Sequence, residues 1–325
     1  MFKKFKAATV QTAPVFLDVE KTIAKAIAFI KEASNNGAQL IAFPEVFIAG
    51  YPYWNWIMTP VQGSQWYEKL YKAAVKTEDE AMQPLFQAAK DFNIHIVIGL
   101  NERGDSFGEI YNTNIIIDNQ GKLIGKHRKL VPTWAEKLTW TSGDGSSLKV
   151  YDTEVGPLGT LACGENTNTL ARFTLLAQGE LVHIANYISL PVAPPDYNMA
   201  EAIKIRAAAH SFEGKLFTIV SCSTISEEIK EALREDVPNV DEVLTRKNSA
   251  FSGFIGPNGA VIGEPLIDEE GIIYAEIDLS KCIQPKQMHD ILGHYNRFDI
   301  FDLRVNTAPT KKITFINDHD EFNRK

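Results

Sequence analysis

Short apolar runs alternate with longer stretches of helical periodicity along most of the chain. The apolar run at 7–11 predicts a strand, and Asp18 is a suitable N-cap for a helix that continues to about Ser34. A second short run at 40–43 predicts a buried strand. The same patterns predict strands at 94–100, 159–162, 181–185 and 216–221, and helices at 167–178, at 196–211 and, with a break near Thr77, at 64–92.

Two β-hairpins are predicted at corresponding points of two strand–helix series. The first joins 111–118 to 122–126 around a turn ending in Gly121, and the second joins 251–256 to 260–263 around a turn ending in Gly259. This correspondence predicts an internal duplication. Alternating strands and helices indicate an α/β fold. Two mixed sheets packed face to face, each covered by helices, would form a four-layer α-β-β-α sandwich.

No change in composition marks a domain boundary. We therefore expect one domain over residues 1–305, with a polar, acidic surface insertion at 227–239. The remaining residues, 306–325, form a charged tail for which two interpretations stay open: contact with a partner subunit, or flexibility.

Composition narrows the classes of partner. Of the 325 residues, 45% are apolar and 23% charged, which is typical of a folded protein rather than a disordered one. The net charge of −8 argues against nucleic acid and anionic membranes as main partners. The three cysteines fit neither a disulfide framework nor a zinc motif, and neither a signal peptide nor a membrane span is apparent. We expect a cytoplasmic protein.

Three chemical groups follow three predicted strands. Glu45 follows the run at 40–43, Lys129 follows the strand at 122–126, and Cys163 follows 159–162. Each has an ordinary structural alternative: an ion-paired strand-end glutamate, a solvated lysine and a small buried thiol. Ligands of α/β sheets gather at the carboxyl ends of strands, so the combination favours one site.

These groups have complementary chemistry. Partial desolvation would raise the pKa of Glu45 toward that of a general base. Cys163 lies at a predicted strand-to-helix turn, where backbone amides favour the thiolate. Lys129 would stabilise negative charge on a tetrahedral intermediate. Phosphate-binding, dinucleotide-binding, zinc-protease and serine-hydrolase motifs are absent from the sequence.

Three segments of the sequence resemble motifs of the nitrilase superfamily of carbon–nitrogen hydrolases. Residues 43–45 (Phe-Pro-Glu), 127–130 (His-Arg-Lys-Leu) and 161–166 (Leu-Ala-Cys-Gly-Glu-Asn) resemble its glutamate, lysine and cysteine motifs. The segments at 129–146, 49–52 and 293–297 resemble the nitrilase branch rather than the amidases. The resemblance covers about residues 5–304 and implies the α-β-β-α sandwich.

The resemblance also implies an activity and an assembly. A nitrile would be hydrolysed to a carboxylic acid and ammonia through a thioimidate and a thioester on Cys163, without metal or organic cofactor. Glu45 would act as base and Lys129 as electrostatic partner. Glu136 resembles the family's second glutamate, which holds the lysine; its alternative is an exposed helical glutamate. Homodimers, extended in many nitrilases into spirals, are implied as well.

The substrate pocket is harder to place from sequence. We expect it to be lined by Tyr51, Thr133, Trp134, Trp140, Gly164, Thr167, Asn186 and Tyr187. Nitrilases commonly carry Trp directly after the cysteine, where this chain has Gly164, so the pocket should be wider or differently lined. Two rival functions stay open: an amidase of the same superfamily, and a filament-forming relative that has lost catalysis.

Overall fold

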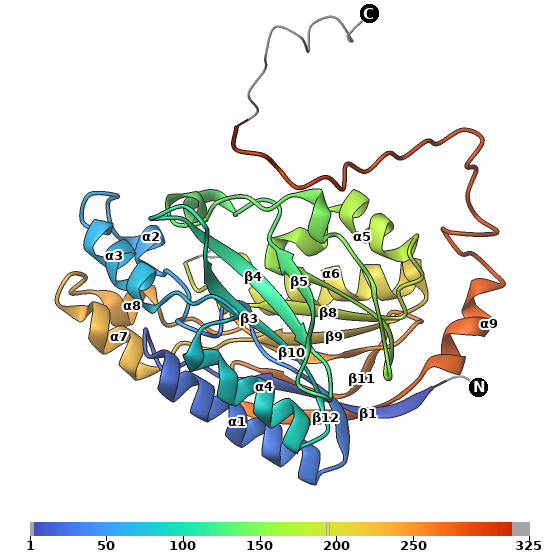
Figure 1. Ribbon diagram of the computed structural model, residues 1–325, viewed down its shortest axis with the longest axis horizontal. Helices are drawn as coiled ribbons and strands as arrows, with labels where there is room; N and C mark the ends of the chain where they lie inside the picture. The colour runs from blue at the N-terminus through green and yellow to red at the C-terminus, as the bar shows by residue number, and fades with distance from the viewer. Residues whose placement is uncertain (1–2, 193, 195, 314–325) are drawn as a thin grey trace, which may run out of the picture.

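The computed structural model describes residues 3–192, 194 and 196–313, and its centre is a pair of six-stranded sheets that face one another (Figure 1). The first sheet has the strand order β12-β1-β2-β3-β4-β5, with bounds Gly271–Asp278, Lys4–Gln11, Ala38–Ala42, His95–Arg103, Ile110–Ile117 and Leu123–Arg128. The second has the order β11-β10-β9-β8-β7-β6, with bounds Val261–Ile267, Phe251–Ile255, Phe217–Cys222, Val182–Tyr187, Gly156–Ala162 and Tyr151–Thr153.

The two sheets share one topology. In the first, β1, β2 and β3 are parallel and β4 and β5 follow as antiparallel hairpin strands. In the second, β7, β8 and β9 are parallel and β10 and β11 follow in the same way. Each sheet is completed by one strand antiparallel to its first parallel strand, β12 on β1 and β6 on β7. The predicted internal duplication is confirmed.

Helices cover the two outer faces of the sheet pair (Figure 1). On the first sheet, α1 (Val19–Asn35) begins at the N-cap Asp18 and buries Ile23, Ala26 and Ile30 at helical spacing. α4 (Gln83–Asp91) lies beside it, and α5 (Thr169–Leu176) and α6 (Met199–Gly214) cover the second sheet. The remaining helices are α2 (Trp54–Ile57), α3 (Ser64–Ala73), α7 (Glu227–Arg234), α8 (Val240–Val243), α9 (Ile283–Lys286) and the 3₁₀ segments η1 (Glu80–Met82), η2 (Trp134–Leu138), η3 (Gly145–Ser147), η4 (Cys163–Thr167) and η5 (Leu279–Cys282).

Alternation along the strands produces separate apolar layers. On β2, Leu40 and Ala42 pack between the sheets, whereas Ile41 packs under α1 and α4. The layer between the sheets also contains Ile184 and Phe217 of the second sheet. Inner strands such as β2 and β8 are largely buried on both faces and are mostly apolar, whereas the edge strand β11 is partly exposed. The predicted four-layer α-β-β-α sandwich is confirmed.

The structure corrects two local predictions. β12 was not predicted, because its pairing partner β1 lies at the other end of the chain and no local turn signals the pairing. The polar segment at 227–239 is not merely a surface insertion, since α7 buries Ile229 and Leu233 in an apolar cluster. No helix in the described ranges combines the length and apolarity needed to cross a membrane.

The predicted tail divides into two parts. Residues 306–313 lie on the surface, where the backbone N–H of Thr310 donates to Asp144 and Lys312 forms an ion pair with Glu109. Residues 314–325 lie outside the described part of the chain. The division between a domain and a tail, and the role of the tail, stay predictions.

A glycine on β3 brings the loop that carries Glu45 against the sheet. The backbone N–H of Gly99 donates to the Pro44 carbonyl at 3.1 Å, and the Gly99 carbonyl accepts from Ile48 N–H at 3.1 Å. A Cβ atom on Gly99 would lie 2.3 Å from the Val46 nitrogen and 2.6 Å from the Pro44 oxygen. Because both neighbours are backbone atoms, a larger residue requires the loop to move.

We therefore expect Gly99→Ala to lower the free energy of unfolding by about 1–3 kcal/mol, the usual cost of overpacking. Activity should fall as well, because the loop holds Glu45. Thermal unfolding and activity measurements check both effects. Gly271→Ala on β12 is the control, since its Cβ would meet Leu266 at an ordinary 3.5 Å. Equal stability of the two variants would contradict the close-approach argument.

Candidate active site

Glu45 lies at the carboxyl end of β2, in a loop fixed from both sheets. Its backbone N–H donates to the Tyr187 carbonyl of β8 at 3.3 Å. Two residues earlier, the Phe43 carbonyl accepts a 2.6 Å hydrogen bond from the side-chain amide of Asn186, which is itself held by Asn114 and Thr160. This buried polar cluster links the two sheets at the edge where their parallel strands end.

The Glu45 carboxylate is buried, and its two oxygens differ in their contacts. Oε1 accepts hydrogen bonds from Lys129 Nζ at 2.9 Å and from Asn112 Nδ2 at 2.7 Å. Oε2 has no hydrogen-bond partner among the described residues. Burial raises the pKa of Glu45, although Lys129 opposes the shift. The unpartnered oxygen is therefore suited to accept a proton.

Lys129 lies between two carboxylates at the end of β5. Its Nζ donates to Glu45 Oε1 and, at 2.7 Å, to Glu136 Oε2, and all three side chains are almost fully buried. Burial opposes protonation of Lys129, but the charges of Glu136 and Glu45 raise its pKa well above the ordinary value. Lys129 is thus a fixed cation, not a proton donor near neutral pH.

Glu136 is held on η2 by contacts to both of its oxygens. Oε2 also accepts from the backbone N–H of Thr133 at 2.6 Å, and Oε1 accepts from the Tyr51 hydroxyl at 2.9 Å. The Tyr51 hydroxyl in turn accepts from the Trp56 indole N–H at 2.9 Å. The alternative of an exposed helical glutamate is wrong, because Glu136 is only 1% exposed.

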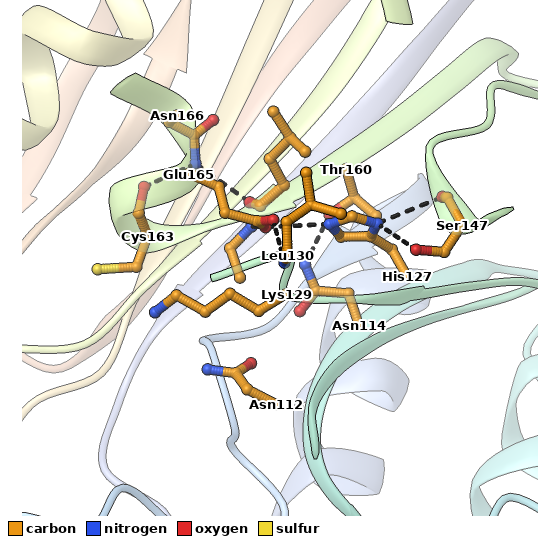
Figure 2. Close-up of polar contacts among 12 residues, drawn as sticks. Asn112, Asn114, His127, Lys129, Leu130, Ser147, Thr160, Cys163, Glu165 and Asn166 are labelled. Atoms are coloured by element: carbon orange, nitrogen blue, oxygen red, sulfur yellow. Dashed lines mark hydrogen bonds and ion pairs between the residues drawn. The ribbon is translucent and has the colours of Figure 1, made fainter. Parts of the chain in front are cut away.

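Cys163 occupies a constrained turn after β7. Its φ is +49°, a left-handed conformation that is uncommon for a residue with a side chain. The 3₁₀ segment η4 follows directly, so the chain turns sharply at the thiol. Figure 2 shows the Cys163 sulfur and the Lys129 ammonium extending to the same side of their backbones.

The electrostatics of Cys163 correct one expectation. We expected backbone amides of the turn to favour the thiolate. Instead, burial and the charge of Glu45 raise the pKa of the Cys163 thiol well above its ordinary value, with Lys129 only partly opposing the shift. The resting residue is therefore a protonated thiol, and it requires a base to become a nucleophile.

Glu165 connects the lysine strand to the cysteine turn (Figure 2). Its Oε1 accepts from the backbone N–H of Leu130 at 2.6 Å. Its Oε2 accepts from the backbone N–H of Ala162 at 2.9 Å and lies 3.0 Å from His127 Nε2. Leu130 adjoins Lys129 and Ala162 adjoins Cys163, so one buried carboxylate fixes the separation of the cation and the thiol.

A second buried network of hydrogen bonds supports the turn at Cys163. Asn166 Nδ2 donates to the carbonyls of Leu161 and Cys163, each at 3.1 Å. Its Oδ1 must therefore be the acceptor for His183 Nε2, at 2.8 Å. His183 Nδ1 lies 2.7 Å from Glu180 Oε1. Burial favours the protonated form of Glu180, but the charge of His183 outweighs burial and lowers the pKa of Glu180 to about 2, so Glu180 is a carboxylate.

Glu180, His183 and His210 bring ligand-type atoms within 4.8 Å of one another, the spacing of a metal site. The second oxygen of Glu180 lies 2.9 Å from His210 Nε2. The hydrogen bonds that link these side chains account for the cluster. We assign it to support of the cysteine turn.

The predicted pocket residues differ in their surroundings. Tyr51, Thr133 and Trp140 adjoin the charged cluster: the Trp140 ring lies 5.8 Å from Lys129 Nζ, and a Cβ on Gly164 would lie 3.1 Å from Thr133 Oγ1. Asn186 is a buried link between the sheets. Tyr187 packs with Cys163, and its hydroxyl has no partner among the described residues.

The remaining predicted residues are Trp134 and Thr167. Trp134 is 77% exposed, and its ring centre lies 6.3 Å from that of Trp56. Thr167 ends η4, and its hydroxyl accepts a 2.6 Å hydrogen bond from Arg206 Nε. The side chains of Trp134 and Thr167 form no hydrogen bond with Glu45, Lys129 or Cys163.

Several residues of the site were not predicted. Asn112 and Glu165 lack a distinctive spacing, although Glu165 is within the cysteine motif. His127 belongs to the lysine motif, but its own role was not predicted. Burial lowers the pKa of His127, and the charge of Glu165 outweighs burial and raises it. Their roles depend on contacts between elements that are far apart in the sequence, which no local pattern reveals.

Comparison with known proteins places the chain in a family. The family model described as carbon-nitrogen hydrolase matches residues 6–287. An aliphatic nitrilase of Rhodococcus rhodochrous is 36% identical over 95% of this chain and 84% of its own length. A nitrilase of Bacillus sp. (strain OxB-1) is 35% identical over 98% of this chain and 92% of its own. The solved structure of the C. elegans NitFhit protein has a TM-score of 0.72 at 19% identity, covering 96% of this chain and 69% of that one.

The structural match supports the fold, and the family model and the two relatives agree along nearly the whole chain. The resemblance inferred from the three motifs is confirmed. This chain belongs to the carbon–nitrogen hydrolase family of the nitrilase superfamily.

Proposed function

We propose that the protein is a nitrilase, which hydrolyses a nitrile to a carboxylic acid and ammonia through covalent intermediates on Cys163. The observation that carries the proposal is the divided Glu45 carboxylate. One oxygen is held by Lys129 and Asn112, and the other is buried, without a partner among the described residues, near a thiol that needs a base. The full-length similarity to relatives named nitrilases supports a nitrile as the substrate.

The first half of the reaction builds a thioimidate. Glu45 takes the proton of the Cys163 thiol while Sγ forms a bond to the nitrile carbon. The nitrile nitrogen gains the negative charge and then the proton, so atoms and charge balance. Lys129 stabilises the developing charge together with backbone N–H groups at Gly164. Because the protonation state of Lys129 is fixed, it contributes charge rather than a proton.

The second half replaces nitrogen with oxygen. Water gives one proton to Glu45 as its oxygen bonds to the thioimidate carbon. That proton and the proton left on the new hydroxyl then pass to the nitrogen, the C–N bond breaks, and ammonia leaves. The resulting thioester is attacked by a second water, which releases the carboxylic acid and returns the proton to the thiol. Glu136 holds Lys129 in place throughout, through the contacts at Thr133 and Tyr51.

Trapping of the covalent intermediate tests the proposal. With a panel of nitriles and their matched amides, we expect a thioimidate or thioester mass on the peptide that contains Cys163, and ammonia release from the nitriles. Cys163→Ala should abolish both, and Cys222→Ala should retain them. Turnover of amides alone would assign an amidase instead. Absence of any adduct across the panel would favour a relative without catalytic activity.

The pH dependence tests the role of Glu45. Catalysis requires its ionised form, and its raised pKa places the acid limb of kcat/KM above the pH expected for an ordinary glutamate, about 4.3. The hydrogen bond from Asn112 lowers that pKa, so Asn112→Ala should move the limb to higher pH. Asn119→Ala, in the β4–β5 turn, should leave it unchanged. A limb that stays or moves to lower pH in Asn112→Ala argues against Glu45 as the base.

Glu165→Gln tests whether the Glu165 carboxylate holds the lysine strand and the cysteine turn together. An amide has one acceptor oxygen, so it cannot serve both Leu130 and the Ala162–His127 pair. We expect the free energy of unfolding to fall by about 3–5 kcal/mol, as for a broken buried ion pair. We also expect alkylation of Cys163 to become slower. Glu102→Gln is the control, because Glu102 is also a buried carboxylate, paired with Lys126 and Arg128 but not with the cysteine turn. Equal alkylation rates in the two variants would remove Glu165 from the positioning of the thiol.

The homodimer or larger spiral implied by the resemblance stays a prediction, as do the cytoplasmic location and the independence from cofactors. Native mass measurement of the full chain addresses the assembly.

A further inference from the structure

Arg206 differs from most arginines of the protein in its partners. Six arginines each form an ion pair with a carboxylate: Arg103, Arg128, Arg172, Arg234, Arg297 and Arg304. Arg206 has no carboxylate within ion-pair distance in the described ranges. It donates instead to two neutral hydroxyls, Thr167 Oγ1 at 2.6 Å and Tyr197 Oη at 3.1 Å. Among the described residues, its charge therefore has no carboxylate counter-charge.

The position of Arg206 on α6 places it beside the nucleophile. The flanking residues of the same helix face, Ile203 and Ala207, pack in one buried cluster with Cys163 and Tyr187. Thr167, to which Arg206 donates, ends the 3₁₀ segment that Cys163 begins. The charge of Arg206 acts on the Cys163 thiol and lowers its pKa, against the larger effects of burial and Glu45.

A buried hydroxyl without a partner lies next to this cation. Tyr187 is 0% exposed, and its Oη has no hydrogen-bond partner among the described residues. Burial raises its pKa well above the ordinary value, and the largest opposing effect is the charge of Arg206. Buried polar groups are normally satisfied, so an unpartnered donor that feels the charge of Arg206 and packs in the cluster of Cys163 indicates a ligand with acceptor atoms.

The other cation of the site is not available to such a ligand. Lys129 is held between Glu45 and Glu136, and both contacts are shorter than 3 Å. Lys129 serves the reacting cyano group, and an acidic substituent at the other end of the substrate would be repelled by those two carboxylates and attracted by Arg206. Arginine is also the side chain best shaped for a carboxylate, because its guanidinium donates two parallel hydrogen bonds.

We propose that Arg206 is a specificity-determining residue that binds an acidic group of the substrate, with the Tyr187 hydroxyl as a second donor, so that nitriles carrying a carboxylate are preferred over neutral nitriles of the same size. The proposal rests on the nitrilase function proposed above. It assigns the cyano group to Cys163 and the acidic end of the substrate to the face of α6.

The competing explanation is that Arg206 serves the thiolate rather than the substrate. The two differ in one measurable respect. A cation that only favours the thiolate accelerates every reaction of Cys163 equally, whereas a cation that binds the substrate's acidic group favours anionic reagents selectively.

The test compares alkylation of Cys163 by iodoacetate and iodoacetamide, which have the same shape and differ in charge. Since both react with the same thiolate, the ratio of their rates isolates recognition of the carboxylate. We expect Arg206→Gln to lower the iodoacetate-to-iodoacetamide ratio about tenfold, the worth of a charge-assisted hydrogen bond. Arg206→Lys should retain part of the preference. Arg234→Gln, which breaks a surface pair with Asp241, should leave the ratio unchanged.

Cys163→Ala gives the background from the other two cysteines. An equal fall of both rates in Arg206→Gln, or no change in either, would overturn the proposal. Because this measurement needs no turnover, it is independent of the nitrilase assignment.

Matched nitriles complete the test. Glutaric acid mononitrile and the neutral methyl ketone of the same length should differ in kcat/KM in favour of the acid. Arg206→Gln should raise KM for the acid about tenfold and change KM for the ketone less than about twofold. A parallel change for both substrates would overturn the proposal. If neither nitrile reacts while the alkylation ratio still depends on Arg206, the acid-binding role stands and the nitrilase assignment falls.

Discussion

The site depends on one buried cation between two carboxylates. Lys129 Nζ lies 2.9 Å from Glu45 and 2.7 Å from Glu136, and none of the three side chains has appreciable contact with solvent. Removing three charges from water is costly, and the cluster carries a net negative charge when all are ionised. Burial of the cluster raises the pKa of Glu45 and, together with the charge of Glu45, that of the Cys163 thiol. It makes Glu45 a usable base and keeps the resting nucleophile protonated.

Such a cluster requires a rigid frame, because a small displacement of one partner would leave a buried charge unpaired. The frame is built at the edge where the parallel strands of both sheets end. Asn186 fixes the loop before Glu45, and Glu165 ties the ends of β5 and β7 together. The ionised Glu180, through His183 and Asn166, holds the carbonyl of Cys163. These polar contacts connect the two sheets, whose other contacts are largely apolar.

Charge compensation also distinguishes the two cations near the thiol. Lys129 is balanced by two carboxylates and belongs to the proposed catalytic cluster, whereas Arg206 donates to hydroxyls and has no carboxylate partner among the described residues. The need of a buried charge for a counter-charge explains the rigidity of the first. The free charge of the second, on a partly buried side chain, carries the proposed selectivity.

The sequence by itself determined the sandwich and its duplication, and it indicated that Glu45, Lys129 and Cys163 follow strands that end at one edge of the fold. Apolar runs and turn residues are local signals, and strand ends of an α/β fold converge. Only the tertiary structure decided the partners of those residues: Asn112, Glu165 and Tyr51 come from other elements. It also decided that β12 completes the first sheet, that Trp134 lies on the surface, and that the thiol is protonated. The physical reason is that burial and charge are sums over neighbours distant in sequence, so a local pattern of residues does not contain them.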